Sequence, residues 1–171
     1  YYGIGWTGQP AIVKWSKEVR EASNIVEEKR TTKALKEVIV AGQDGKIYFY
    51  NLLDGVATRD PIDLGAPSAG GLSLATNGVP VLGVGQSHAM LAKKTINSGY
   101  HLINLVPIEE GALIRTDGDE RNSSYSGVLG SALFDSKTGT MIFGTQGGTL
   151  YTVELGTTEN AFNTSDLKMS L

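Results

Sequence analysis

VIVAGQDGKIYFY, at residues 38–50, and MIFGTQGGTLYTV, at residues 141–153, are the two stretches of sequence that decide the fold. Each begins with an apolar run suited to a buried strand, passes through a glycine-bearing turn and ends in an alternating strand that carries a tyrosine. Asp-Gly and Gly-Gly between such runs are typical of β-hairpins, because glycine adopts the positive φ angles that tight turns need. The two stretches therefore predict two hairpins of one pattern.

A third stretch, VLGVGQ at residues 81–86, matches the first half of the same pattern. Its partner strand resumes at residues 100–105, so residues 87–98 are interpreted as an insertion at the hairpin tip, where insertions are tolerated. The chain therefore carries three related hairpins, and we take this as an internal repeat.

Further strands are expected on both sides of these hairpins. Apolar runs bounded by turn residues precede them at 8–13, 71–75 and 130–135. Fourth strands are expected at residues 57–62 and 112–116, the second of them after a turn at Glu110 and Gly111. Residues 167–171 are interpreted as the start of a further strand.

A unit of four strands that recurs about every 60 residues predicts an all-β fold. The expectation is a partial β-propeller of about three four-stranded antiparallel blades, which form a single domain over residues 1–171. The blades are expected at about residues 5–64, about 69–118 and about 128–171, with the third incomplete.

One charged segment interrupts the β pattern. Val19, Ala22, Ile25 and Val26 have helix-like spacing, which predicts a short amphipathic helix over residues 17–28 in an inserted loop of the first blade. The charges around it have mixed sign, which is typical of a solvated helix face; a helix that docks a partner is the alternative.

Composition narrows the function. The net charge of −3 provides no basic field, so no nucleic-acid partner is expected. The absence of cysteine excludes disulfides, thiolate nucleophiles and cysteine-based zinc sites. No apolar stretch approaches the roughly 20 residues that span a bilayer, so no membrane insertion is expected.

The repeat unit resembles the PQQ-like (quinoprotein-like) β-propeller repeat. Residues 42–48, GQDGKIY, match its apolar run, glycine, Asp-Gly turn and tyrosine strand closely, and residues 146–151, QGGTLY, match it fairly. Residues 6–10, 13–15, 44–49 and 58–62 look like a subgroup of longer, uncharacterised bacterial proteins of this type, many of which look exported. The resemblance thus implies an extracytoplasmic or cell-surface location in a bacterium.

The departures from that family shape the functional hypotheses. The candidate fourth strands lack the late tryptophan of quinoprotein dehydrogenases, and no calcium-binding set or catalytic aspartate can be placed. The favoured hypothesis is therefore a non-catalytic scaffold, without a cofactor, that binds a ligand or a protein. The alternative is a fragment of a PQQ-dependent quinoprotein oxidoreductase, for which Ca²⁺ and pyrroloquinoline quinone are the implied cofactors. A WD40-like scaffold ranks last, because the repeats lack Trp-Asp and Gly-His dipeptides.

Candidate site residues are few. Asp117, Asp119 and Asn122 form the densest group of oxygen ligands and are the candidate site for a structural cation, although the EF-hand spacing is missing. Trp6, near a strand entrance, is the candidate for a ligand or partner surface. No catalytic residue is assigned.

Other polar and aromatic residues are interpreted as structural. His88 and His101, the two histidines, are expected to be solvated or packed. Tyr48 and Tyr151 share a repeat position and are expected to fill the space between blades. The glycines of residues 83–86 are expected to admit close strand packing rather than a nucleotide, because no third glycine or helix follows.

Three blades cannot close a ring, and the terminal ones would expose apolar faces. Since the chain begins with Tyr1 and not Met, we expect it to be part of a longer protein. The expected partners are therefore the remaining blades of that protein or a second copy of this chain.

Overall fold

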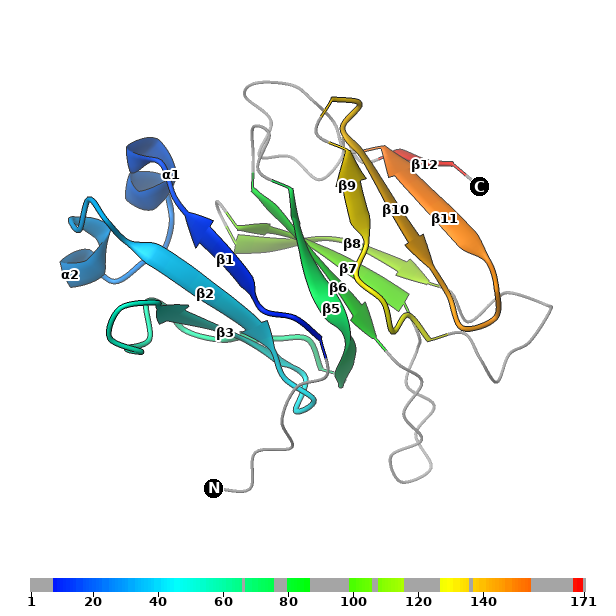
Figure 1. Ribbon diagram of the computed structural model, residues 1–171, viewed down its shortest axis with the longest axis horizontal. Helices are drawn as coiled ribbons and strands as arrows, with labels where there is room; N and C mark the ends of the chain where they lie inside the picture. The colour runs from blue at the N-terminus through cyan, green and yellow to red at the C-terminus, as the bar shows by residue number, and fades with distance from the viewer. Residues whose placement is uncertain are drawn as a thin grey trace.

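The computed structural model consists mainly of β-strands, arranged as three four-stranded antiparallel sheets that lie side by side (Figure 1). It describes residues 8–65, 67–75, 80–86, 99–105, 108–115, 127–135, 137–154 and 168–170. The strands of each sheet follow the chain order, so every sheet is a meander. The three described sheets do not close on themselves into a ring.

Each sheet takes four consecutive strands. Sheet 1 contains β1 (Ala11–Lys14), β2 (Lys36–Ala41), β3 (Lys46–Asn51) and β4 (Ile62–Asp63). Sheet 2 contains β5 (Ser68–Ala75), β6 (Val81–Gln86), β7 (Gly99–Leu105) and β8 (Ile108–Arg115). Sheet 3 contains β9 (Leu133–Asp135), β10 (Thr140–Gly144), β11 (Leu150–Glu154) and β12 (Lys168–Ser170). Two short helices, α1 (Lys17–Ala22) and α2 (Glu27–Arg30), lie between β1 and β2.

The three predicted hairpins are confirmed, and two of them have the same register. The corresponding pairs are Val38↔Tyr50 with Met141↔Val153, Val40↔Tyr48 with Phe143↔Tyr151, and Ala41↔Ile47 with Gly144↔Leu150. Their turns also agree, since the last turn glycine has a φ of 82° at Gly45 and 84° at Gly148. The first strands extend the match, because Ile12 pairs with Val38 as Phe134 pairs with Met141.

These equivalent hairpins bury opposite faces. In sheet 1, Ile39 and Phe49 are buried against sheet 2. In sheet 3 the buried side chains are Met141, Phe143, Tyr151 and Val153, which lie on the opposite face of the equivalent hairpin. Sheet 2 explains the difference: it lies between the two, so each outer sheet turns a different face toward it. We call these faces inner and the opposite ones outer.

Sheet 2 is buried on both sides. Leu82 and Val84 share a hydrophobic core with sheet 1, whereas Tyr100 and Leu102 share a second core with sheet 3. Its central strand β7 is buried at every position. The first strands of the three sheets also meet, because β5 contacts both β1 and β9.

Glycines of β6 make room for the Tyr100 ring of the neighbouring strand β7 and for Val128, which precedes sheet 3. A Cβ at Gly83 would lie 2.6 Å from Cε1 of Tyr100, and a Cβ at Gly85 would lie 3.0 Å from Cγ1 of Val128. The backbone N–H of Val128 donates to the carbonyl of Gln86 at 2.9 Å. These contacts agree with the expected packing role of this glycine-rich strand.

The predicted fourth strand of sheet 1 is misplaced, whereas the one expected at residues 112–116 of sheet 2 is present but begins earlier. In sheet 1, residues 57–62 form only an isolated bridge at Ala57, and β4 begins at Ile62. In sheet 2, β8 begins at Ile108, so Gly111 lies within the strand and not in a turn. The strand interpreted from residues 167–171 is present as β12 and pairs with β11 as the last strand of sheet 3.

The single helix expected over residues 17–28 is wrong. Ser16 caps α1, which ends at Ala22, and an extended segment separates it from α2. The break follows from burial, because the side chain of Ile25 is fully enclosed in the core shared by sheets 1 and 2. A continuous helix would not deliver this side chain to the core.

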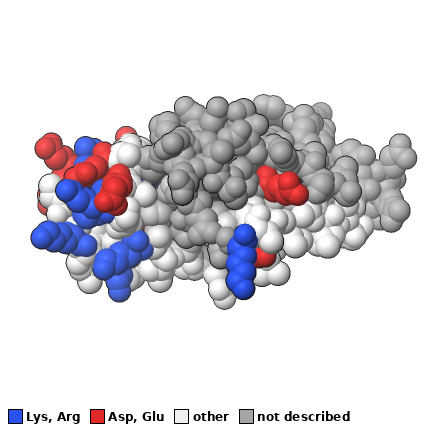
Figure 2. Space-filling view, turned by 90° about the horizontal axis from the view of Figure 1, so that it is seen from above, with Lys and Arg blue, Asp and Glu red and all other residues white. Residues whose placement is uncertain are grey.

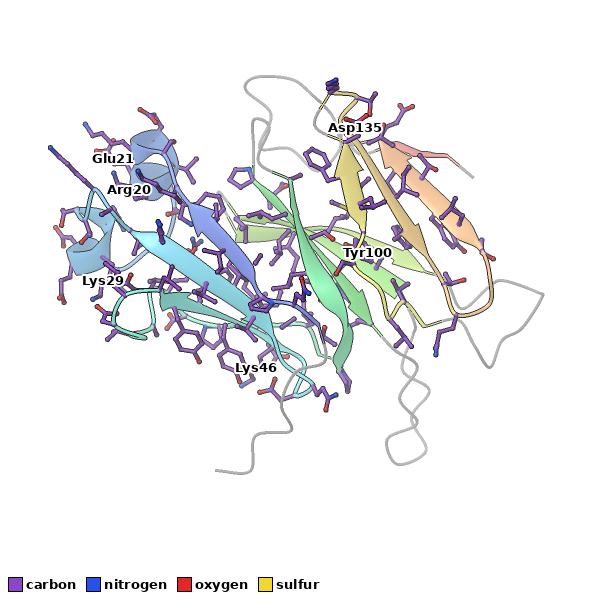
Figure 3. All side chains as sticks on the ribbon, in the orientation of Figure 1. Arg20, Glu21, Lys29, Lys46, Tyr100 and Asp135 are labelled. Atoms are coloured by element: carbon purple, nitrogen blue, oxygen red, sulfur yellow. The ribbon has the colours of Figure 1, made fainter. Side chains whose placement is uncertain are left out.

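The charged face of this insertion is also less solvated than expected. Arg20 is buried, and its guanidinium donates to the carbonyls of Arg30 and Thr32, both at 2.7 Å. Arg30 in turn donates to the carbonyl of Ile25 at 2.9 Å. Figure 3 shows Arg20 between the two helices, while Lys17 and Glu21 remain an exposed ion pair.

We expect Gly83→Ala to reduce the free energy of unfolding by about 1–3 kcal/mol, because the added methyl overlaps the Tyr100 ring in a filled core. Denaturant unfolding followed by circular dichroism measures the change. Gly130→Ala is the matched control, because a Cβ there meets no atom within 4 Å. Equal stability of Gly83→Ala and the parent would contradict the close packing of the Tyr100 ring on Gly83 of β6.

Candidate functional site

The outer face of sheet 1 is apolar and aromatic. Ile12, Val38 and Tyr50 form one cross-strand row, and Val40 and Tyr48 form the next. Ile12 is 60% exposed and Tyr50 is 36% exposed, and the rings of Tyr48 and Tyr50 stack with centroids 6.2 Å apart. Contiguous exposed apolar side chains of this kind mark surfaces that bind a partner.

The outer face of sheet 3 has the same character. Leu133 and Ile142 form a cross-strand pair, and Leu150 stands beside it, opposite Gly144. Leu133 is 76% exposed and Leu150 is 66% exposed. Within the part of the chain that the structure describes, no other sheet packs on the apolar outer face of sheet 1 or of sheet 3.

Charged residues border these faces in separate sets. Lys14 and Lys36 form an exposed pair beside the Ile12–Val38 row of sheet 1. Asp135 and Glu154 flank Thr140 in an exposed row on the outer face of sheet 3. Hydrogen bonds donated by the Lys137 backbone and the Thr138 hydroxyl lower the pKa of Asp135 and keep it ionised at neutral pH. The exposed rows that border the apolar residues therefore differ in sign, with lysines on sheet 1 and carboxylates on sheet 3, where Lys168 pairs with Glu154 at the edge of the row.

A buried ion pair lies at one end of the core between sheets 1 and 2. The Glu37 carboxylate accepts from Arg59 Nε at 3.0 Å and from Arg59 Nη2 at 2.6 Å, in bidentate geometry. Trp15 Nε1 donates to the same carboxylate at 2.7 Å, and the Thr58 hydroxyl donates to its other oxygen. The Arg59 guanidinium also stacks on the Phe49 ring, 4.6 Å from its centroid.

The partners of Glu37 show that this centre is structural. Its side chain is fully buried and all of its recorded bonds are to residues of the same sheet and its connections. Arg59 Nη1 also reaches Asn24 Oδ1 at 3.3 Å, which attaches the helical insertion to the sheet. A carboxylate saturated in this way has no approach for a substrate, so we assign it to folding rather than catalysis.

Sequence reasoning missed this ion pair, although the signal was present. Glu37 is in phase with Ile39 and Ala41, the inward-facing residues of β2. A charge at a buried strand position requires a partner of opposite sign. Arg59, in the segment where a strand was expected, is that partner.

Aromatic rings join sheets 2 and 3. Tyr100 stacks on Phe143 with centroids 4.3 Å apart, and Phe143 stacks on Tyr151 at 5.3 Å. Burial raises the pKa of Tyr100 to about 12, so its hydroxyl stays protonated at neutral pH. Tyr100 is labelled in Figure 3, where sheet 2 meets sheet 3. The ring contact confirms the packing role expected for Tyr151, whereas its repeat equivalent Tyr48 is half-buried on an outer face.

Most candidate site residues from the sequence fall outside the described residues. Trp6, Asp117, Asp119 and Asn122 belong to this group, as does His88. His101 lies on β7 and is buried, as expected for a packed histidine. Among the described histidine, aspartate and glutamate side chains, no three gather in a way that could hold a metal ion. Neither described helix is long and apolar enough to cross a membrane.

Comparisons with known proteins leave the family open. No model of a known protein family matches this chain, and no curated protein sequence matches it. Figure 2 shows that most of the visible charged side chains gather at the end that carries the helices, whereas the rest of the described surface in that view is largely uncharged.

We expect Arg59→Met to reduce the free energy of unfolding by about 3–5 kcal/mol, because it leaves the Glu37 carboxylate buried without its counter-charge. The double variant Glu37→Leu with Arg59→Met should lose less than the sum of the two single changes, since it removes both charges together. A double-mutant cycle by denaturant unfolding measures the coupling.

Lys29→Met is the matched control for this cycle, because Lys29 forms a 2.6 Å ion pair with Asp54 at the surface. Solvent screens such a pair, so stability should change little. Additive effects at Glu37 and Arg59 would show that the buried pair is not a coupled unit.

Proposed function

We propose that this chain is a β-propeller repeat module that serves as a non-catalytic binding scaffold. The observation that carries the proposal is the opposite burial of the equivalent hairpins β2–β3 and β10–β11. When repeated sheets stack in one orientation, each sheet packs one face against the next sheet and its other face against the preceding sheet. The faces left open at both ends are then binding surfaces, because each repeats a face that is buried elsewhere in the chain.

The placement of the first strands supports a radial arrangement. In a propeller the first strand of each blade lies nearest the axis. Here β5, the first strand of sheet 2, contacts both β1 and β9, the first strands of its neighbours. Figure 1 shows β5 in the middle of the molecule, between β1 and β9.

The proposed partner class is a protein. Flat apolar faces bordered by charges suit another folded surface better than a small ligand, which needs a concave site. The proposed setting, outside the cytoplasm of a bacterium, rests on the resemblance of the repeat to quinoprotein-like propellers.

The radial arrangement predicts unequal distances between sheets 1 and 3. Because the chain has no cysteine, spin labels can be placed by single substitutions to cysteine. Labels at Ile12 on β1 and Leu133 on β9 should lie closer together than labels at Tyr50 on β3 and Thr152 on β11. Pulsed electron resonance on labelled protein diluted with unlabelled protein measures both distances. Equal distances would indicate parallel layers and would refute the propeller.

Titration with pyrroloquinoline quinone in the presence of Ca²⁺ tests the scaffold against the quinoprotein alternative. The expected result is no saturable change in quinone absorbance or tryptophan fluorescence. Omission of Ca²⁺ is the control for quinone that adheres without a metal. Saturable, Ca²⁺-dependent binding would overturn the non-catalytic proposal in favour of a quinoprotein oxidoreductase.

A further inference from the structure

The outer face of sheet 1 has the pattern of a face that is already packed in this molecule. Its positions Ile12, Val38, Val40, Tyr48 and Tyr50 correspond in register to Phe134, Met141, Phe143, Tyr151 and Val153 of sheet 3. Those residues form the inner face of sheet 3, where all but the half-buried Phe134 are buried against sheet 2. The outer face of sheet 1 is therefore suited to a preceding sheet of the same repeat.

The outer face of sheet 3 has the reciprocal pattern. Leu133, Ile142 and Leu150 occupy the register positions that Ala11, Ile39 and Ile47 hold in sheet 1. In sheet 1 these positions face sheet 2. The outer face of sheet 3 is therefore suited to a following sheet of the same repeat. Sheet 1 of this chain is such a sheet, because its outer face has the pattern of a face that packs on a preceding sheet.

Charge favours the same pairing. Suppose that sheet 3 of one copy packs on sheet 1 of another with equivalent register positions at the same level along the strands. The acidic row of Asp135 and Glu154 then lies between the Ile12–Val38 row and the Lys14–Lys36 row of the facing sheet. All four charged side chains are exposed. Opposite charges at the rim of an interface set orientation and register and suppress wrong partners.

We infer that the partner of both outer faces is a second copy of this chain. The outer face of sheet 3 of each copy packs on the outer face of sheet 1 of the other, so a two-fold axis relates the copies. Three sheets from each copy then complete a ring of six, within the range of about 4–8 blades found in propellers. The inference rests on the proposed function, because it continues the same stacking across a molecular boundary.

The oligomeric state tests this directly. Sedimentation equilibrium of the purified chain should give twice the monomer mass of 18.2 kDa. Leu150→Glu should raise the dissociation constant of the dimer roughly a hundredfold, because it places an unpaired charge in an apolar interface. The matched control is Leu53→Glu, at a residue that is 75% exposed in the turn after β3 and outside the strands of both outer faces, and it should leave the dimer intact.

Charge reversal tests the register of the pairing. Lys36→Glu and Glu154→Lys should each weaken the dimer about tenfold, because each creates a like-charge contact. The double variant should restore most of the lost affinity, which a merely structural role of either residue would not produce. Circular dichroism checks that each variant is folded.

Three outcomes would overturn the inference: a mass of 18.2 kDa at the solubility limit, equal weakening by Leu53→Glu and Leu150→Glu, or a double charge variant weaker than both singles. The spin-label distances within one chain are independent of these results. A monomer with unequal distances would leave the proposed propeller standing and reject only the second copy. Equal distances would reject both.

Discussion

A sheet with apolar side chains on both faces requires a neighbour on each side, and this constraint organises the molecule. Sheet 2 meets it, since every residue of β7 is buried between the cores shared with sheets 1 and 3. Burial of apolar area is the main favourable term in folding, at roughly 25 cal/mol per Å². Among the described residues, sheets 1 and 3 each pack against another sheet on one face only. The side chains of Ile12, Leu133 and Leu150 on the outer faces remain exposed to solvent, so the single chain does not bury all of its apolar sheet surface.

Close packing of the sheets depends on small residues as much as on large ones. The Tyr100 ring fits between sheets 2 and 3 because position 83 has no side chain. Ser73 contributes in a similar way, since its hydroxyl donates to the carbonyl of Ala132 at 2.6 Å and so links the two sheets. The interface thus combines stacked rings, a glycine and a hydrogen bond. A substitution at any one of these positions would disturb the packing of the others.

Local turn chemistry made the hairpins predictable. Gly45 and Gly148 stand at turn positions with positive φ, and the apolar alternation on either side fixes which residues pair. The elements that were wrong depend on distant contacts. Ile25 breaks the expected helix because it fills the core between sheets 1 and 2, and Arg59 displaces the expected strand because it reaches Glu37. The phase of Glu37 with Ile39 and Ala41 signals a buried charge, but the sequence around it does not identify Arg59 as its partner.

Alignment of the third stretch with the first does not show which face of the sheet its side chains occupy. Leu82 aligns with Ile39, yet both belong to the core between sheets 1 and 2, so they face one another instead of pointing the same way. A slip of one residue in a strand reverses every side chain, and sequence similarity alone does not resolve it. The correspondence between the outer faces of sheets 1 and 3 can therefore be recognised only from strand register and burial together. The candidate site residues Trp6, Asp117, Asp119 and Asn122 lie outside the described residues.

The Glu37 carboxylate has a consequence for how the molecule opens. It is bonded to the end of β1 through Trp15 and to the segment before β4 through Thr58 and Arg59, and Arg59 extends the link to the helical insertion through Asn24. Regions joined by shared buried bonds exchange their amide hydrogens as one cooperative unit. Despite its charged sequence, the helical insertion should therefore unfold only together with sheet 1. It is expected to be as rigid as the sheet itself.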